Sequence, residues 1–229
     1  PVTWISALQL KASVGSTGNS ELRGNYRHLG LIGTTPYMGN TGWYLTQPSN
    51  TQLGWEKQIQ TNVGFNLSLW NKLHIDFSWY NRLTKDMLMS MPLPYTTGFS
   101  ALMMNIGQLR NRGVELEVVW DAIRTEDAFM TVRVNYAYNK NQIVKLFNGI
   151  SEWPMPDYWL SYIEGQSVNF YMPIYAGVDK EDGAPMWYLP GHSGEAGNTF
   201  NPETMTKTYS DDLYQDTGKS YYAPHTGGF

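Results

Sequence analysis

The sequence predicts an all-β fold, in which antiparallel strands form part of a large transmembrane β-barrel with long extracellular loops. Three observations support this prediction. Five segments alternate apolar and polar residues with period two, some of these segments are long for strands of soluble proteins, and short and long connections follow one another along the chain. Period-two alternation indicates strands whose two faces meet different environments.

The alternating segments are the five expected strands. They span about residues 7–14, 58–70, 72–85, 114–121 and 128–140. In the third segment, Leu73, Ile75, Phe77 and Trp79 alternate with His74, Asp76 and Ser78. The segment 58–70 holds 13 residues, whereas a tilted membrane strand needs about 9–11 and a strand in a soluble protein averages about 5–6. Strand length therefore favours a membrane barrel.

The connections differ in length in a regular way. Asn71 marks a tight turn between the second and third strands, and residues 122–128 form a short polar link. The three other connections are expected to be surface loops, at about 15–57, 86–113 and 141–229. Short turns at one end and long loops at the other are typical of outer-membrane barrels, while a soluble sandwich usually has more evenly spaced strands.

The two phases of the strands differ in chemistry. Charged residues lie on the polar phase, namely Lys11, Asp76, Glu115, Glu117 and Arg133. A water-filled or plugged lumen accepts such charges, and lipid would then meet the aliphatic phase. A soluble antiparallel sheet with one wet face gives the same alternation. Aromatic residues near the strand ends favour the membrane, because barrels carry aromatic girdles there: Trp70, Trp79, Trp120, Tyr136 and Tyr138.

Composition excludes several classes of protein. The chain of 229 residues has a formal net charge of -4, and no basic stripe supports nucleic-acid binding. The absence of cysteine excludes thiol catalysis, disulfides and Cys-ligated zinc. No apolar run approaches the roughly 18 residues of a membrane-spanning helix, although a barrel crosses the membrane with alternating strands instead.

Enzymatic activity has little support, and we predict no catalytic residue and no cofactor. The four histidines are scattered, without the HExxH spacing of a zinc site. Glu115 and Glu117 share a strand face at about 6.6–6.8 Å, a separation that suits an inverting glycosidase. A charged lumen lining is the favoured interpretation, with Arg110 and Arg112 expected to face polar surroundings such as this pair of glutamates.

Aromatic residues in or beside the expected loops are candidates for ligand or partner contact, because exposed aromatic clusters mark interaction surfaces. The rings of this set are Trp43, Tyr44, Trp55, Trp153, Tyr158, Trp159, Tyr162, Tyr171, Trp187 and Tyr188. The candidate ligand- or partner-binding residues among them are Trp43, Tyr44, Trp153, Tyr158, Trp159, Trp187 and Tyr188. The alternative for each ring is packing of the loops against each other.

The acidic turn Asp179, Glu181 and Asp182 before Gly183 is a weak candidate for a Ca²⁺ site, because Ca²⁺ binds carboxylate and carbonyl oxygens. Its spacing does not match the twelve-residue loop of an EF-hand. A solvated turn is the favoured interpretation, so no metal site is predicted.

Six phrases in order carry a resemblance to a known family. They are LKASVGSTGNSEL (10–22), LGWEKQIQTNVGFNLSLWNKLHIDFSWYNRLTKDML (53–88), PLPYTTGFSALMMNIGQLRNRGVELEV (92–118), VNYAYNKNQIVKL (134–146), YAGVDKEDGAPMWY (175–188) and APHTGGF (223–229). Together they resemble the SusC/RagA family of TonB-linked outer-membrane transporters of Bacteroidetes. Nearly the whole chain is covered by the resemblance.

The resemblance implies a multi-pass barrel in the outer membrane, of about 22 strands around a plugged lumen. The chain would supply about five strands from its later part, and the plug and N-terminal domain are expected to lie outside this chain. Such transporters import oligosaccharides or peptides with a SusD-like lipoprotein as a lid and with energy from the TonB complex, contacted through parts not in this chain. Outer-membrane lipid would surround the barrel.

Two alternatives to a transporter stay open from the sequence. One is a soluble or surface-attached β module that binds glycans through its aromatic rings, in which case the aliphatic phase would face a core. The other is a passive porin, which needs an open lumen.

Overall fold

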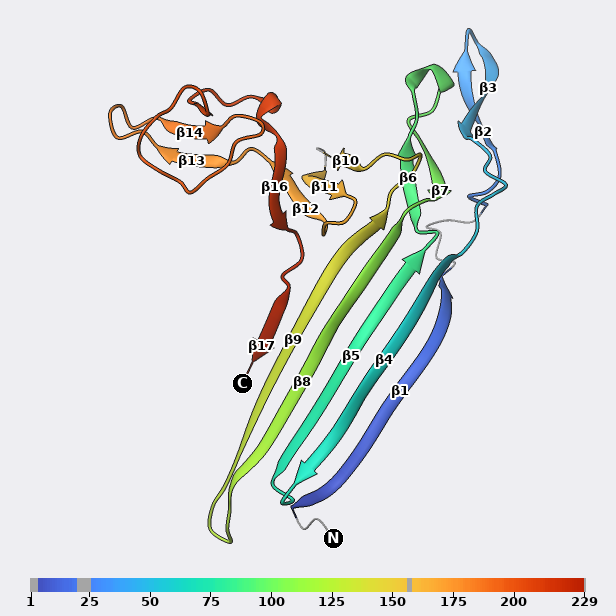
Figure 1. The fold of residues 1–229 in the computed structure, drawn as a ribbon. Helices are drawn as coiled ribbons and strands as arrows, with labels where there is room; N and C mark the ends of the chain where they lie inside the picture. Colours follow the sequence, from blue (N-terminus) through green and yellow to red (C-terminus); the bar gives the residue numbers. More distant parts are fainter. Residues whose placement is uncertain (1–3, 20–25, 156–157, 229) are drawn as a thin grey trace. The chain divides into compact units, whose positions relative to one another are not determined.

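The computed structural model describes residues 4–19, 26–155 and 158–228 (Figure 1). The chain divides into two compact units, Pro1–Lys140 with His225–Phe229, and Asn141–Pro224. Almost all regular structure is β, which confirms the predicted all-β class. Within the described residues, no helix has the length and apolar character needed to cross a membrane.

A six-stranded sheet dominates the first unit. Its strand order is β1-β4-β5-β8-β9-β17, and Figure 1 shows the first five as long strands lying side by side. Their bounds are β1 (Ile5–Asn19), β4 (Glu56–Leu69), β5 (Leu73–Lys85), β8 (Gln108–Arg124), β9 (Phe129–Lys145) and β17 (His225–Gly228). β1 pairs with β4, β4 with β5, β5 with β8 and β17 with β9, all antiparallel.

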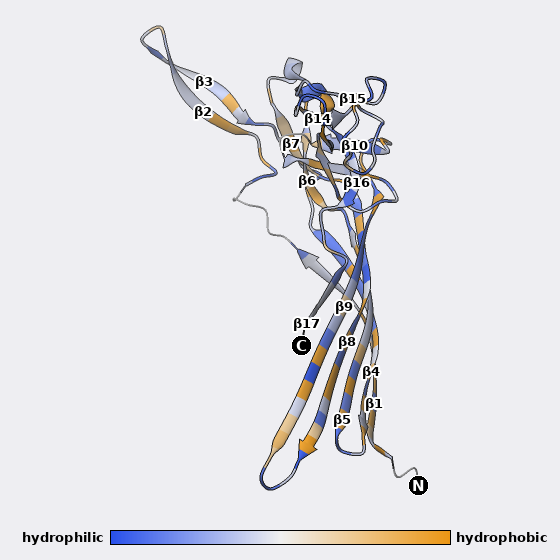
Figure 2. Ribbon diagram, turned by 90° about the vertical axis from the view of Figure 1, so that its left-hand side faces the viewer, coloured by the Kyte–Doolittle hydropathy of each residue, from blue (hydrophilic) through white to orange (hydrophobic). Residues whose placement is uncertain are grey.

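The pairing register carries the sequence pattern across the sheet. Directly opposite residues share a face, and Phe65 lies opposite Phe77, which in turn lies opposite Leu116. The Phe65 and Phe77 rings stack with centroids 5.4 Å apart. The adjacent pair along the strands, Ser78 opposite Glu115, points to the other face of the sheet and is polar. Figure 2 shows the resulting alternation of hydrophobic and hydrophilic bands along the long strands.

Tight turns close one end of the sheet. Trp70 and Asn71 both have positive φ, 51° and 54°, and the Lys72 amide donates to the Leu69 carbonyl at 2.9 Å. Positive φ at both central positions is the geometry of a type I′ turn, which matches the twist of paired strands. β8 and β9 are joined by a second short link, in which the Thr125 amide donates to the Ala128 carbonyl at 2.8 Å.

Three strands are longer than the sequence pattern predicted. The first was expected at 7–14 and spans Ile5–Asn19, and the fourth was expected at 114–121 and spans Gln108–Arg124. The fifth was expected at 128–140 and spans Phe129–Lys145. The added stretches lack apolar alternation, yet each residue from Gly15 to Asn19 has a partner on β4. Backbone pairing alone extends a strand where side chains give no signal.

The expected loops at 15–57 and 86–113 contain hairpins. β2 (Leu31–Tyr37) pairs with β3 (Asn40–Gln47), and β6 (Leu88–Pro92) pairs with β7 (Ala101–Asn105). A 3-10 turn, η1 (Tyr95–Thr97), lies between β6 and β7. The loop prediction for these segments was therefore incomplete, because short two-residue turns and irregular alternation hide hairpins from a pattern search.

The second unit is also a folded body, not a bare connection. One sheet has the order β10-β11-β12-β16 and the other the order β13-β14-β15. The bounds are β10 (Glu152–Met155), β11 (Leu160–Ile163), β12 (Asn169–Met172), β13 (Tyr175–Val178), β14 (Pro185–Tyr188), β15 (Met205–Thr206), η3 (Asp211–Leu213) and β16 (Gln215–Ser220). Ala176, Met186 and Tyr188 form a small buried core.

Candidate functional site

The long sheet has two chemically different faces and no core on either. Within the described part of the first unit, Gly64 and Gly113 alone are buried. Apolar side chains lie open on one face, with Val63 49% exposed and Val134 45% exposed. We call this the outward phase, and the opposite face, which carries Asp76 and Glu115, the inward phase.

Ion pairs run across the inward phase. Lys11 Nζ lies 3.1 Å from Asp76 Oδ2, and Arg133 Nε lies 3.2 Å from Glu117 Oε1. All four side chains are at least 46% exposed, so each pair contributes only about 0–1 kcal/mol to stability. Their effect is instead to line this face with fixed charges of both signs.

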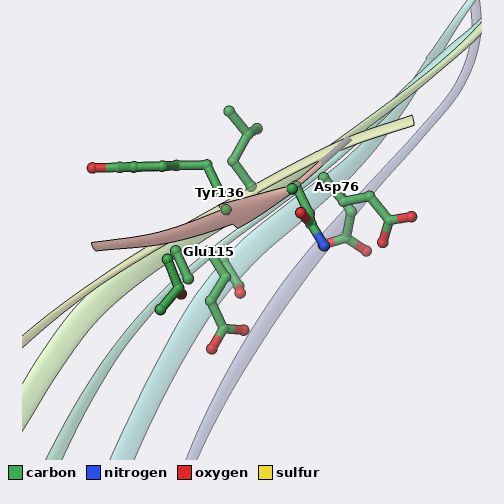
Figure 3. Close-up of a pocket in the computed structure, with 11 residues that line it drawn as sticks. Asp76, Glu115 and Tyr136 are labelled. Carbon is green, nitrogen blue, oxygen red and sulfur yellow. The ribbon is translucent and has the colours of Figure 1, made fainter. Parts of the chain in front are cut away.

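A cavity of about 480 Å³ lies on the inward phase (Figure 3). Asp76, Ser78, Glu115, Glu117 and Asn135 contribute to its lining, together with Thr226–Gly228 of β17. Glu115 forms no ion pair within the described residues. Figure 3 shows the Glu115 carboxylate and the Tyr136 ring extending to opposite sides of the strands. The cavity therefore presents carboxylate acceptors, with Glu115 uncompensated.

Tyr80 lies on the same face of β5, two residues after Ser78 of the cavity lining. Its hydroxyl donates to Asn139 Oδ1 at 3.0 Å, and the Arg82 guanidinium lies 4.7 Å from the centre of its ring. The ring occupies the space beside Gly113, where a β-carbon would lie 2.7 Å from the Tyr80 hydroxyl and would overlap the Tyr138 carbonyl. Only glycine therefore fits at position 113.

Two of the candidate binding rings lie on the hairpin of the first unit. Trp43 and Tyr44 on β3 are 74% and 52% exposed. Opposite strand pairing places Trp43 beside Thr34 and Tyr44 beside Gly33. Both residues are more than half exposed, so another molecule can reach them.

The other five candidates lie in the second unit and differ in burial. Tyr158 and Trp159 are exposed. Trp153 packs edge-on against Phe147 with centroids 4.9 Å apart, and Trp187 packs against Tyr209 at 5.6 Å. Among the described residues, no two of the seven candidate rings contact each other.

The burial of Tyr188 contradicts the prediction that it is a surface-binding residue. It is 6% exposed and belongs to the core with Met186. Its hydroxyl donates to the Glu195 carbonyl at 3.0 Å, so the polar end of the ring is satisfied inside the protein. Alternation on the short strand β14 directs Met186 and Tyr188 inward and leaves Trp187 between them on the other face.

The acidic turn holds a lysine. Lys207 Nζ lies 2.8 Å from Asp182 Oδ2 and also contacts Asp179, which is buried. The hydrogen bond from Lys207 is the main cause that lowers the pKa of Asp179 and of Asp182, and the Glu181 amide assists at Asp179. An ammonium group thus balances both carboxylates. Within the described residues, no group of three potential metal ligands was found.

The expectation for Arg110 and Arg112 was wrong. Arg110 lies opposite Leu83 and Arg112 opposite Asn81, on the outward phase. Glu115 and Glu117 lie on the inward phase, because the parity of a residue along a strand fixes its face. Counting parity from Leu116 would have placed both arginines correctly. By contrast, no local signal links Lys207 to Asp179 or Tyr80 to Gly113.

Together, the long strands, open apolar phase and charged inward phase define the wall of a membrane-spanning β-barrel. Comparison with known proteins agrees. The family model described as TonB dependent receptor-like, beta-barrel, matches residues 2–229. The chain therefore belongs to the TonB-dependent receptor β-barrel family, whose SusC/RagA members are outer-membrane proteins.

Individual relatives are longer than this chain. The chain is 30% identical over 211 residues to TonB-dependent receptor P3 of Formosa agariphila, covering 86% of this chain and 21% of that protein. It is 31% identical over 157 residues to TonB-dependent receptor SusC of Bacteroides thetaiotaomicron, covering 65% and 16%. The solved RagAB peptide transporter matches with TM-score 0.85 and 36% identity, over 100% of this chain and 25% of that chain. The chain thus spans about a quarter or less of these relatives.

Proposed function

We propose that this chain forms barrel wall and surface structure of a SusC-like, TonB-dependent transporter that imports nutrients through the outer membrane. The observation that carries the proposal is the two-faced sheet. Its outward phase is apolar through the span, whereas its inward phase carries ion pairs and an acidic cavity. Such a wall suits lipid on one side and a hydrated or plugged lumen on the other.

The proposed cargo is a polar oligomer, either an oligosaccharide or a peptide. Exposed rings on the hairpin and in the second unit, Trp43, Tyr44, Tyr158 and Trp159, offer faces for stacking on sugars or for packing on a SusD-like lipoprotein lid. The similarity to a solved peptide transporter supports peptides, and the similarity to SusC supports membership of the same transporter group.

The two alternatives from the sequence have less support. In a soluble glycan-binding module the outward phase would face a core, yet Ile59, Val63 and Trp79 are all exposed in the described part of the first unit. A passive porin would need no TonB. Family membership favours energy-coupled uptake, since the matched model describes a TonB-dependent receptor barrel.

The test uses the full-length transporter that contains this chain, in its native host. Deletion of its gene is expected to abolish growth on one class of oligomer, tested with defined peptides and defined oligosaccharides as sole nutrient. Removal of TonB should give the same growth defect. Uptake that persists without TonB would contradict the proposal and favour a porin, and normal growth of the deletion strain on every oligomer would contradict nutrient import.

A further inference from the structure

Basic residues gather at one end of the outward phase. Lys57 lies opposite Lys85 in the pairing of β4 with β5. Arg110 lies opposite Leu83 and Arg112 opposite Asn81 in the pairing of β5 with β8. These four side chains therefore occupy three successive rows on the same face.

Lys140 joins this group from β9. Two odd-numbered residues of β9 contact the inward phase. Arg133 lies 3.2 Å from Glu117, and Asn139 donates a hydrogen bond to Asn111 at 3.5 Å. Alternation along the strand then places the even-numbered side chain of Lys140 on the outward phase. We call Lys57, Lys85, Arg110, Arg112 and Lys140 the basic band.

Acidic residues are absent from this face. All five acidic residues of the long strands β1, β4, β5, β8 and β9 lie on the inward phase; they are Glu56, Asp76, Glu115, Glu117 and Asp121. Within the described residues, no member of the basic band forms an ion pair. The Nε atom of Arg110 is buried without a hydrogen-bond partner there. The positive charge of the band is therefore uncompensated by the described part of the chain.

The basic band lies at the end of the sheet with the long connections. Tight turns at Trp70–Asn71 and 125–128 close the opposite end, and short turns face the periplasm in bacterial barrels. Leu73 to Leu83 is ten residues along β5, about 34 Å at about 3.4 Å per residue. At a tilt of about 40° this spans about 26 Å, close to the apolar band of about 25 Å. The row of Leu83 and Arg110 thus meets the outer boundary of the hydrocarbon.

Long basic side chains suit this depth. Arg and Lys bury their aliphatic stems in apolar surroundings and extend the charge to the interface. A guanidinium binds phosphate through two parallel hydrogen bonds. We propose that the basic band binds the phosphate groups of lipid headgroups in the outer leaflet, which would fix the height of this part of the wall in the membrane.

The test uses the full-length transporter, purified and reconstituted in nanodiscs. The probe is lipid A with both phosphates, and its binding is measured by native mass spectrometry beside lipid A from which the phosphates have been removed. A basic side chain at a membrane surface contributes about fivefold to affinity for anionic lipid. Replacing Arg110, Arg112 and Lys140 with Gln is expected to weaken binding of phosphorylated lipid A by about a hundredfold at low salt.

A matched control removes the same charge from the other face. Replacing Lys11, Arg82 and Arg133 with Gln alters three strands of the same sheet on the inward phase, and is expected to leave lipid binding unchanged. The double variant Arg110→Lys with Arg112→Lys keeps the charge and should retain most binding, which separates loss of charge from misassembly. Equal binding by the outward and inward Gln variants, or equal binding of dephosphorylated lipid A, would overturn the proposal.

This inference rests on the location of the chain in the outer membrane and not on the cargo. A negative result in the lipid-binding test would not contradict the proposed nutrient uptake. A negative result in the uptake test would not contradict the proposed lipid binding. If the band instead contacts an acidic protein, the outward Gln variant will lose that protein while keeping phosphorylated lipid A, and this outcome also overturns the proposal.

Discussion

The long sheet and the second unit are stabilised in opposite ways. The sheet pairs β4 with β5 without interruption from Lys57 to Leu69 but buries no large side chain in the described part of the first unit. The second unit has short strands of at most six residues, yet it buries Met186, Ala176 and Leu213. A protein in water needs a core, whereas a barrel wall buries its apolar face in lipid. The difference assigns a membrane environment to one region and an aqueous environment to the other.

The largest expected effect is in the sheet, at Gly113. Gly113→Val would drive its side chain into the Tyr138 carbonyl and the Tyr80 ring. Overpacking typically costs about 1–3 kcal/mol and occasionally more, and the upper end applies here because the nearest atom is a backbone carbonyl oxygen. We expect the full-length barrel to lose its folded, heat-modifiable band on a denaturing gel. Gly15→Val is the matched control, because a β-carbon at Gly15 has no neighbour within 4 Å. Normal assembly of the Gly113→Val variant would contradict the close packing of Tyr80 and the Tyr138 carbonyl around Gly113.

The second prediction separates the two faces of one strand. Phe77 lies on the outward phase between Phe65 and Leu116. Phe77→Arg places a charge near the middle of the bilayer and should cost about 2–4 kcal/mol. Ser78→Arg, one residue away, faces Glu115 and should be nearly neutral. The free energy of unfolding of both variants is measured by urea titration in lipid vesicles. Equal losses of unfolding free energy in the two variants would contradict the assignment of faces.

The third prediction concerns the second unit. Lys207→Met removes the ammonium between Asp179 and Asp182 and leaves the buried Asp179 carboxylate unbalanced. We expect several-fold faster cleavage of this unit by an added protease while the barrel stays folded. Lys219→Met is the control, since Lys219 forms no ion pair within the described residues. Unchanged cleavage of the Lys207 variant would show that the pair is dispensable.

The same pair predicts a pH dependence. The pKa of Asp179 and of Asp182 is lowered and the pKa of Lys207 is raised, each mainly by their mutual hydrogen bonds. Stabilisation from a lowered carboxyl pKa is lost as pH falls through the folded value, and stabilisation from a raised lysine pKa is lost as pH rises through its folded value. Protection from protease should therefore be highest around neutral pH and fall in acid. In the Lys207→Met variant, protection from protease should depend less on pH in the acid range.

The smallest effect on stability is expected at the open rings. Trp43→Ala on the hairpin should change unfolding free energy by no more than about 0.5 kcal/mol, because the ring is 74% exposed. Binding of a SusD-like lipoprotein or of cargo should weaken, measured by co-purification and by calorimetry. Tyr188→Ala gives the contrast, since removing a core aromatic costs about 3–5 kcal/mol. Unchanged binding by the Trp43 variant would exclude that ring from the interface.

The sequence predicted the sheet well because a strand in lipid has a local signature. Alternation of Leu73, Ile75 and Phe77 with polar residues gives both the strand and its face. The hairpins β2–β3 and β6–β7 and the ends of β1, β8 and β9 were missed, because their residues give no clear alternating side-chain pattern. The partners Lys207 and Asp179 are 28 residues apart in the printed sequence, and only the folded second unit brings them together.

The binding candidates were harder to predict for the same reason. Trp187 and Tyr188 are neighbours in the sequence, but alternation on β14 makes one a surface ring and the other a core residue. Burial of a ring depends on which distant segment covers it, and composition carries no such information. The faces of Arg110 and Arg112, however, follow from parity alone once one residue of β8 is assigned.

The most direct test of the central claim is cysteine scanning of β5, from Leu73 to Lys85, in the full-length transporter with any other cysteines removed. Each single-cysteine variant is reacted in intact outer membranes with a maleimide that dissolves only in water. The two-faced wall predicts labelling that alternates with period two, with Asp76, Ser78 and Tyr80 positions reactive and Ile75, Phe77 and Trp79 positions protected by lipid. Uniform labelling along the strand, or protection of the inward positions only, would contradict the claim that this sheet separates lipid from the lumen.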